Sequence, residues 1–229
     1  MGSALTALSL RTWSRYVVPF TLLALLAYAP LLLLANRLSV PTSVDQARAL
    51  AVITWILGSI AILLALGIVG AVAPTVRAVD AGSPPSQHAA LLAGLRGLVS
   101  SIVPAGAAIF ALLLGLGAVV VPGLVLAPLV ALTAASTEIG LSARFADAAA
   151  VGRAHGRTIA LVLVFMILVG VGVLVAVEHW AHLPLSKKAS PALIAGTQRF
   201  PHVALPLLAL LVPIAATVLA AIHTVARRR

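Results

Sequence analysis

Long stretches without any charged side chain are the feature that most restricts how this sequence can fold. No Asp, Glu, Lys or Arg occurs between Arg48 and Arg77, or between Arg96 and Glu138. A helix of about 20 apolar residues, rising about 1.5 Å per residue, crosses the hydrocarbon core of a bilayer. The first stretch therefore fits one membrane crossing. The second is too long for one crossing and long enough for two.

The composition of the whole chain agrees with a lipid environment. Hydrophobic residues make up 62% of the sequence and charged residues 9%, with a mean hydropathy of +1.17. Soluble domains carry a charged fraction of about 25%, so this chain lacks the polar side chains needed to cover its apolar surface in water. Lipid offers no hydrogen-bond partners to an open backbone, which favours helices. We expect an all-α, polytopic transmembrane bundle.

The predicted helices end where apolar runs meet charged or turn-forming residues. A hinge at Pro122-Gly123 divides the longest run, and Pro30 after Ala27-Tyr28-Ala29 argues for a retained first helix rather than a cleaved signal peptide. The chain is expected to form one membrane domain, 1–229. Its predicted spans cover residues 16–34, 49–72, 89–120, 124–137, 159–177 and 201–226.

The stretch between Glu138 and Arg157 is too charged to cross a membrane. Its apolar positions Leu141, Phe145, Ala148 and Val151 or Gly152 share one helical face. This spacing predicts a short helix over residues 141–152 that lies in the membrane interface, with its charged side toward water.

The distribution of Lys and Arg predicts the orientation. Six crossings place both termini on one side of the membrane, and basic residues concentrate on the cytoplasmic side. One side collects ten: Arg11, Arg15, Arg77, Arg96, Arg144, Arg153, Arg157, Arg227, Arg228 and Arg229. The other collects five: Arg37, Arg48, Lys187, Lys188 and Arg199. We therefore expect both termini in the cytoplasm, in the cytoplasmic (inner) membrane of a bacterium, as the arginine-rich, lysine-poor composition suggests.

The order of features between Leu91 and Val177 is similar to that of a known family of membrane domains. A long apolar helix leads to Val-Val-Val-Pro-Gly at 119–123, then to Thr-Glu-Ile-Gly at 137–140, then to a basic interfacial stretch at 141–157. This order resembles the membrane domain attached to some bacterial glycerophosphodiester phosphodiesterases, and related stand-alone six-helix proteins. The resemblance implies a membrane-embedded helper or anchor. The soluble phosphodiesterase domain with its metal-binding carboxylates is absent, so the resemblance does not imply that activity.

The sequence contains no recognised catalytic pattern. It lacks HExxH, G-x-S-x-G and the P-loop glycine-lysine pattern. It also has no cysteine, which excludes disulfides and thiolate metal sites, and its five acids fall near predicted helix ends or loops. We expect neither an enzyme nor a cofactor.

The histidines are the remaining candidates for chemistry. Glu178, His179 and His182 are spaced so that a metal could bind them, although polar residues beside Trp180 at a span end are an ordinary interfacial feature. His202 and His223 have no sequence neighbour that completes a site. Structural roles are the favoured interpretation for all of these residues.

The basic cytoplasmic face is the best candidate for an interaction. Each basic residue near an anionic lipid surface contributes about 1 kcal/mol to binding. The alternative is that these residues only set the orientation. Either interpretation explains the net charge of +10 without nucleic acid. The candidate headgroup contacts are Arg144, Arg153, Arg157, Arg227, Arg228 and Arg229.

Polar and small residues within the spans mark the packing. Hydroxyl groups in membrane helices usually bond to backbone carbonyls, and small residues four apart allow close approach, as at Gly67 with Ala71 and Gly172 with Ala176. The hydroxyl groups are those of Thr54, Ser59, Ser100, Ser101 and Thr217.

Three functions remain open from sequence. The leading one is a non-enzymatic protein that organises the membrane, or anchors a membrane-bound partner. The second is a small transporter for an uncharged or lipid-like solute, with Ser101, Thr54 or Thr217 lining a cavity. The third is a lipid-modifying enzyme that uses His and Arg in an interfacial cleft.

Overall fold

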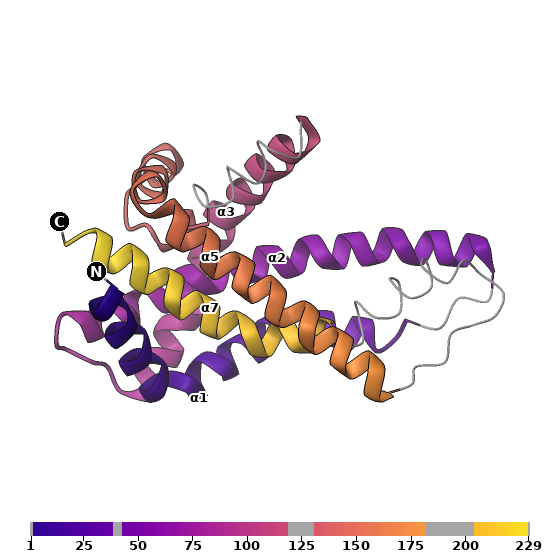
Figure 1. The fold of residues 1–229 in the computed structure, drawn as a ribbon, viewed down its shortest axis with the longest axis horizontal. Helices are drawn as coiled ribbons and strands as arrows, with labels where there is room; N and C mark the ends of the chain where they lie inside the picture. The colour runs from indigo at the N-terminus through magenta and orange to yellow at the C-terminus, as the bar shows by residue number, and fades with distance from the viewer. Residues whose placement is uncertain (1, 39–42, 119–130, 182–203, 229) are drawn as a thin grey trace.

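A computed structural model describes residues 2–38, 43–118, 131–181 and 204–228, and their regular structure is helical (Figure 1). The helices are α1 (Gly2–Ala35), α2 (Val44–Asp80), α3 (Gln87–Ala118), the single 3₁₀ turn η1 (Thr133–Ala135), α5 (Leu141–Ala181) and α7 (Leu205–Ala226). Five of the helices are long and apolar enough to cross a bilayer. The all-α, multi-pass membrane architecture expected from sequence is therefore confirmed.

The helices contain most of the predicted span residues but extend beyond the predicted bounds at several ends. The second, third and fifth predicted spans lie within α2, α3 and α5, apart from residues 119–120, which fall outside the described residues. The sixth prediction ends at 226, as α7 does, and its residues 201–203 also fall outside. The first prediction begins at Tyr16, where the structure has a kink rather than a helix start.

The predicted fourth span, 124–137, is wrong over the part that the structure describes. Residues 124–130 lie outside the described residues. Residues 131–137 form a turn, η1 and a short irregular stretch. We expected a helix because irregular backbone is costly in lipid. Here the irregular backbone packs against α2 and α3 and is buried from residue 131 to 136, where protein groups replace lipid.

A glycine in α2 makes room for this buried segment. A Cβ atom added to Gly70 would lie 2.1 Å from Oγ of Ser101 on α3 and 2.4 Å from the carbonyl oxygen of Ala134. The predicted seam at Gly67 and Ala71 is also internal, because a Cβ at Gly67 would lie 3.1 Å from Leu98 of α3. Small residues thus join α2, α3 and the buried segment closely.

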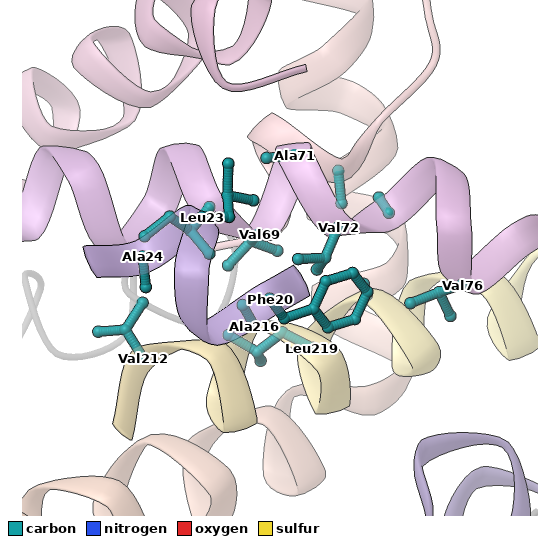
Figure 2. Close-up of a cluster of buried hydrophobic side chains, with 14 of the residues drawn as sticks. Phe20, Leu23, Ala24, Val69, Ala71, Val72, Val76, Val212, Ala216 and Leu219 are labelled. Carbon is teal, nitrogen blue, oxygen red and sulfur yellow. The ribbon is translucent and has the colours of Figure 1, made fainter. Parts of the chain in front are cut away.

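The remaining core joins α1, α2 and α7. Figure 2 shows Phe20 of α1 between Val72 of α2 and Leu219 of α7. The hydroxyl of Tyr28, also on α1, donates a 2.7 Å hydrogen bond to the carbonyl oxygen of Ala61 on α2. This cluster fixes α7 against the first two helices.

Several chain segments meet at one end of the bundle, which we call the polar end. Figure 1 places both termini there. The Tyr16 hydroxyl of α1 donates to the carbonyl oxygen of Pro85, just before α3, over 2.6 Å. Arg228 after α7 pairs with Asp80 at the end of α2. The first turns of α5 join the same end through Asp147, described below.

Two helices bend near the polar end. Backbone angles leave the helical region at Tyr16 in α1 (φ −116°, ψ 17°) and at His155 in α5 (φ −130°, ψ 17°). Figure 1 shows the helix direction changing within each of them. We call residues 2–15 the first half of α1 and residues 141–154 the first half of α5. The predicted interfacial helix, 141–152, is therefore continuous with the fifth span, across a kink.

Candidate functional site: an ion-pair cluster at the polar end

A buried histidine–carboxylate pair joins α5 to α7. Nε2 of His223 lies 2.9 Å from Oδ2 of Asp147, and each side chain is only 4% exposed. Asp147 comes from the first half of α5, and His223 from the last turn of α7. An imidazole that carries its proton on Nε2 can donate it to this carboxylate, so the contact does not require a charged ring.

Arg227 binds the other oxygen of the same carboxylate. Its Nη2 lies 2.6 Å from Oδ1 of Asp147 and 2.7 Å from Oε1 of Glu138. The Ser136 hydroxyl also bonds to Asp147. The bond with Asp147 raises the pKa of Arg227 above its usual range, so the guanidinium stays charged.

Two further arginines donate hydrogen bonds to backbone carbonyl oxygens in the buried segment, residues 131–136, and just after it. Nη1 of the half-buried Arg77 donates to the carbonyl oxygen of Ala135 over 3.0 Å, and Nε of Arg144 donates to that of Glu138 over 3.0 Å. Arg77 thereby satisfies one acceptor of the irregular backbone at residues 131–137. A buried carbonyl without such a donor costs free energy, so Arg77 has a structural role.

Positive groups outnumber negative ones in this cluster by one. Arg77, Arg144, Arg227 and Arg228 supply four positive groups, and Asp80, Glu138 and Asp147 supply three negative ones. Removing one partner of a buried pair leaves an uncompensated charge, which destabilises by roughly 3 kcal/mol or more in buried settings. Asp147 is 4% exposed and Arg227 about half exposed, so loss of Arg227 leaves a buried carboxylate without its cation, whereas loss of Asp147 leaves an arginine that water and Glu138 still contact.

The arrangement does not resemble a hydrolytic site. Ser136 contacts the carboxylate rather than His223, so the histidine is not placed as a base for that hydroxyl. Both His223 and Asp147 are closed off from a headgroup substrate by burial. Within the described ranges, no group of three His, Cys, Asp or Glu side chains is arranged to hold a metal.

The predicted headgroup contacts divide into two sets. Arg227 and Arg228 pair with carboxylates of the protein, and Arg144 is partly buried against the Glu138 carbonyl. Arg153 and Arg157 are exposed on either side of the α5 kink, and neither has a hydrogen bond or ion pair with any residue that the structure describes. Arg229 lies outside the described residues.

The other sequence candidates have simpler positions. Glu178 and His179 belong to the last turns of α5, whereas His182 and His202 lie outside the described residues. Thr217 bonds to the carbonyl oxygen of Pro213 one turn earlier. Ser59 and Ser100 likewise bond to carbonyl oxygens of their own helices, as predicted for packing rather than a solute path.

Sequence reasoning missed the link between Asp147 and His223. Two signals were present. His223 and Arg227 are four residues apart, on one face of α7, and Asp147 is four residues before Val151, at the edge of the apolar face of the interfacial helix. A carboxylate on an apolar face requires a partner. The partner lies 76 residues away in sequence, which spacing rules do not reach.

The fold and the candidate spans define the class as a multi-pass α-helical membrane protein. Comparison with models of known families, with curated proteins and with solved structures finds no match. The role of the polar end is therefore inferred from its own residues.

Proposed function

We propose that this protein is a non-enzymatic organiser of the cytoplasmic membrane, whose polar end binds anionic lipid headgroups. The observation that carries the proposal is the pair of exposed arginines, Arg153 and Arg157, next to the kink of α5. The carboxylates of the polar end are already used by Arg227 and Arg228. The free arginines are thus available to phosphate groups, which a guanidinium binds in a bidentate manner.

The geometry of the first half of α5 supports the same function. Ala148, Val151 and Gly152 are buried, as the apolar face predicts, whereas Arg153 is exposed. Leu141, which was expected on the buried face, is 42% exposed. An amphipathic helix beside the ends of transmembrane helices is a typical form for an element that lies in the headgroup region.

The proposed topology has the polar end and both termini in the cytoplasm. Arg11, Arg15, Arg77, Arg227 and Arg228 belong to segments that meet at this end, which supports the cytoplasmic assignment. Both termini lie at this end in Figure 1, as this topology requires.

A membrane-bound partner remains part of the proposal. The resemblance to the membrane domain of bacterial glycerophosphodiester phosphodiesterases agrees with a helper or anchor, although residues 131–137, the described part of the short helix expected before Glu138, are not α-helical. The transporter alternative gains no support from Thr217, whose hydroxyl bonds within α7.

Lipid selectivity tests the proposal. The protein is placed in nanodiscs of phosphatidylcholine with and without phosphatidylglycerol, and bound lipids are counted by native mass spectrometry. The double variant R153Q/R157Q should lower the preference for phosphatidylglycerol at least about tenfold, since each arginine contributes about 1 kcal/mol near an anionic surface.

A matched control removes two arginines from the other predicted side. R37Q/R48Q makes the same change in net charge, at residues outside the polar end. It should leave the selectivity close to that of the wild type. Equal losses in the two double variants, or a wild type without preference for the anionic lipid, would refute the proposed function.

A further inference from the structure

The first half of α5 has little apolar surface with which to hold its place. Its buried apolar positions are Ala148, Val151 and Gly152, which are small or medium-sized, and its one aromatic residue, Phe145, is only partly buried. Because packing energy grows with the apolar area and the number of atoms in contact, these residues hold the segment weakly. Its position must depend on another contact.

Asp147 supplies that contact. One carboxylate bonds to His223 and Arg227 of α7 and to Ser136 of the buried segment. Charge-assisted hydrogen bonds are about twice as strong as neutral ones, and the carboxylate that accepts these is only 4% exposed. The other charged residues in this half, Arg144 and Arg153, make no described contact with α7.

The Asp147 carboxylate also pairs with Arg227, which could otherwise bind headgroups together with Arg153 and Arg157. Arg227 is about half exposed, so its guanidinium is within reach of the headgroup region. While Asp147 and Glu138 bind it, its charge is neutralised locally. An anionic headgroup can take over Arg227 only by competing with these two carboxylates.

We propose that Asp147 is an autoinhibitory latch, which docks the first half of α5 on α7 and withholds Arg227 from anionic headgroups. This inference rests on the proposed lipid-binding function and adds its regulation. Opening the latch undocks the amphipathic half and adds one arginine to those exposed at the polar end. By linkage, a lipid that binds the open state better shifts the population toward it.

Spin-label distances test the docking directly, because the chain contains no cysteine. Cysteines replace Ser142 in the first half of α5 and Ser83 in the loop before α3, both of which are exposed. In D147N, a second and broader distance population should appear between the two labels in nanodiscs. The preference for phosphatidylglycerol should rise, by less than the roughly fivefold that about 1 kcal/mol from a fully released arginine would give, because Glu138 still pairs with Arg227.

Three controls separate the latch from simpler effects. A label pair at Ser14 and Ser83, which reports on the first half of α1, should stay unchanged in D147N. E138Q removes the other carboxylate that pairs with Arg227 but keeps the Asp147 contacts. The distribution of distances between the Ser142 and Ser83 labels, which we call the α5 distance, should therefore stay narrow. T224V removes a hydroxyl that bonds within α7, next to His223, and should also leave the α5 distance unchanged.

The outcomes distinguish the two proposals. An unchanged α5 distance in D147N overturns the latch, and so does equal undocking in E138Q. If D147N does not fold, R227Q serves instead, because it removes one partner and leaves the carboxylate bonded to His223; it should give a smaller open population, and an unchanged distance there overturns the latch too. A wild type without anionic preference refutes the proposed function, while the distances still decide whether Asp147 docks the helix.

Discussion

The two kinked helices, α1 and α5, hold similar bent halves at the polar end by different kinds of contact. In α1 the kink has a covalent cause, since Pro19 lacks the N–H that would bond to the Arg15 carbonyl and its ring crowds that carbonyl. The freed oxygen accepts a long, 3.5 Å hydrogen bond from Nε2 of Gln87. Tyr16 at the kink is fully buried and bonds to the Pro85 carbonyl.

In α5 no proline accounts for the kink. It falls at His155, directly before Gly156, a residue type that weakens helices. The first half of α5 is held to α7 about two turns before the kink, by the ion pair and hydrogen bond of Asp147. The comparison indicates that α1 is bent permanently by neutral contacts at its hinge, whereas the docking of α5 depends on charges that ligands can compete for.

The largest effect should come from removing the apolar support of the α1 kink. Phe20 is 1% exposed, and its ring stacks on Tyr16 with centroids 5.7 Å apart. F20A should lower the free energy of unfolding by roughly 3 kcal/mol or more, because it leaves a cavity among α1, α2 and α7. Reversible unfolding in bicelles measures the loss.

A lipid-facing position on the same helix provides the control. Leu22 is 44% exposed, and L22A should change the free energy of unfolding far less than F20A does. If both variants lose the same stability, the α1 kink does not depend on the packing of Phe20.

A smaller effect should follow from removing the hydrogen bond at the α1 kink. Y16F deletes the hydroxyl that donates to Pro85, and should cost about 1 kcal/mol, the net value of a typical hydrogen bond. The distance between labels at Ser14 and Ser83 should broaden while that between Ser142 and Ser83 stays narrow. Broadening of both pairs would show that the two halves are not fastened independently.

The five helical spans were largely predictable because the bilayer thickness and the charge-free runs together leave few choices. The interfacial face of Ala148, Val151 and Gly152 followed from helical spacing in the same way. The irregular segment before Glu138 was not predictable, since it depends on the space beside Gly70 and on a donor from Arg77. Neither is visible as a local pattern.

The candidate site was predictable only in part. Arginine positions indicated a basic end, and Arg153 and Arg157 are exposed there, as a headgroup contact requires. Whether an arginine is free or paired depends on carboxylates from distant segments, such as Asp80 beside Arg228. In the sequence Arg227 and Arg228 are indistinguishable from Arg153, because no local pattern places α2 and α5 beside the end of α7.

The most direct test of the account is the side of the membrane from which each segment of the polar end can be reached. Single cysteines are placed at Ser14, Ser83 and Ser142, and at Ser43 before α2, all of them exposed positions. In sealed vesicles of known orientation, a membrane-impermeant thiol reagent should label the first three from the cytoplasmic face and Ser43 only from the opposite face. Labelling of Ser14 and Ser142 from opposite faces would contradict the account.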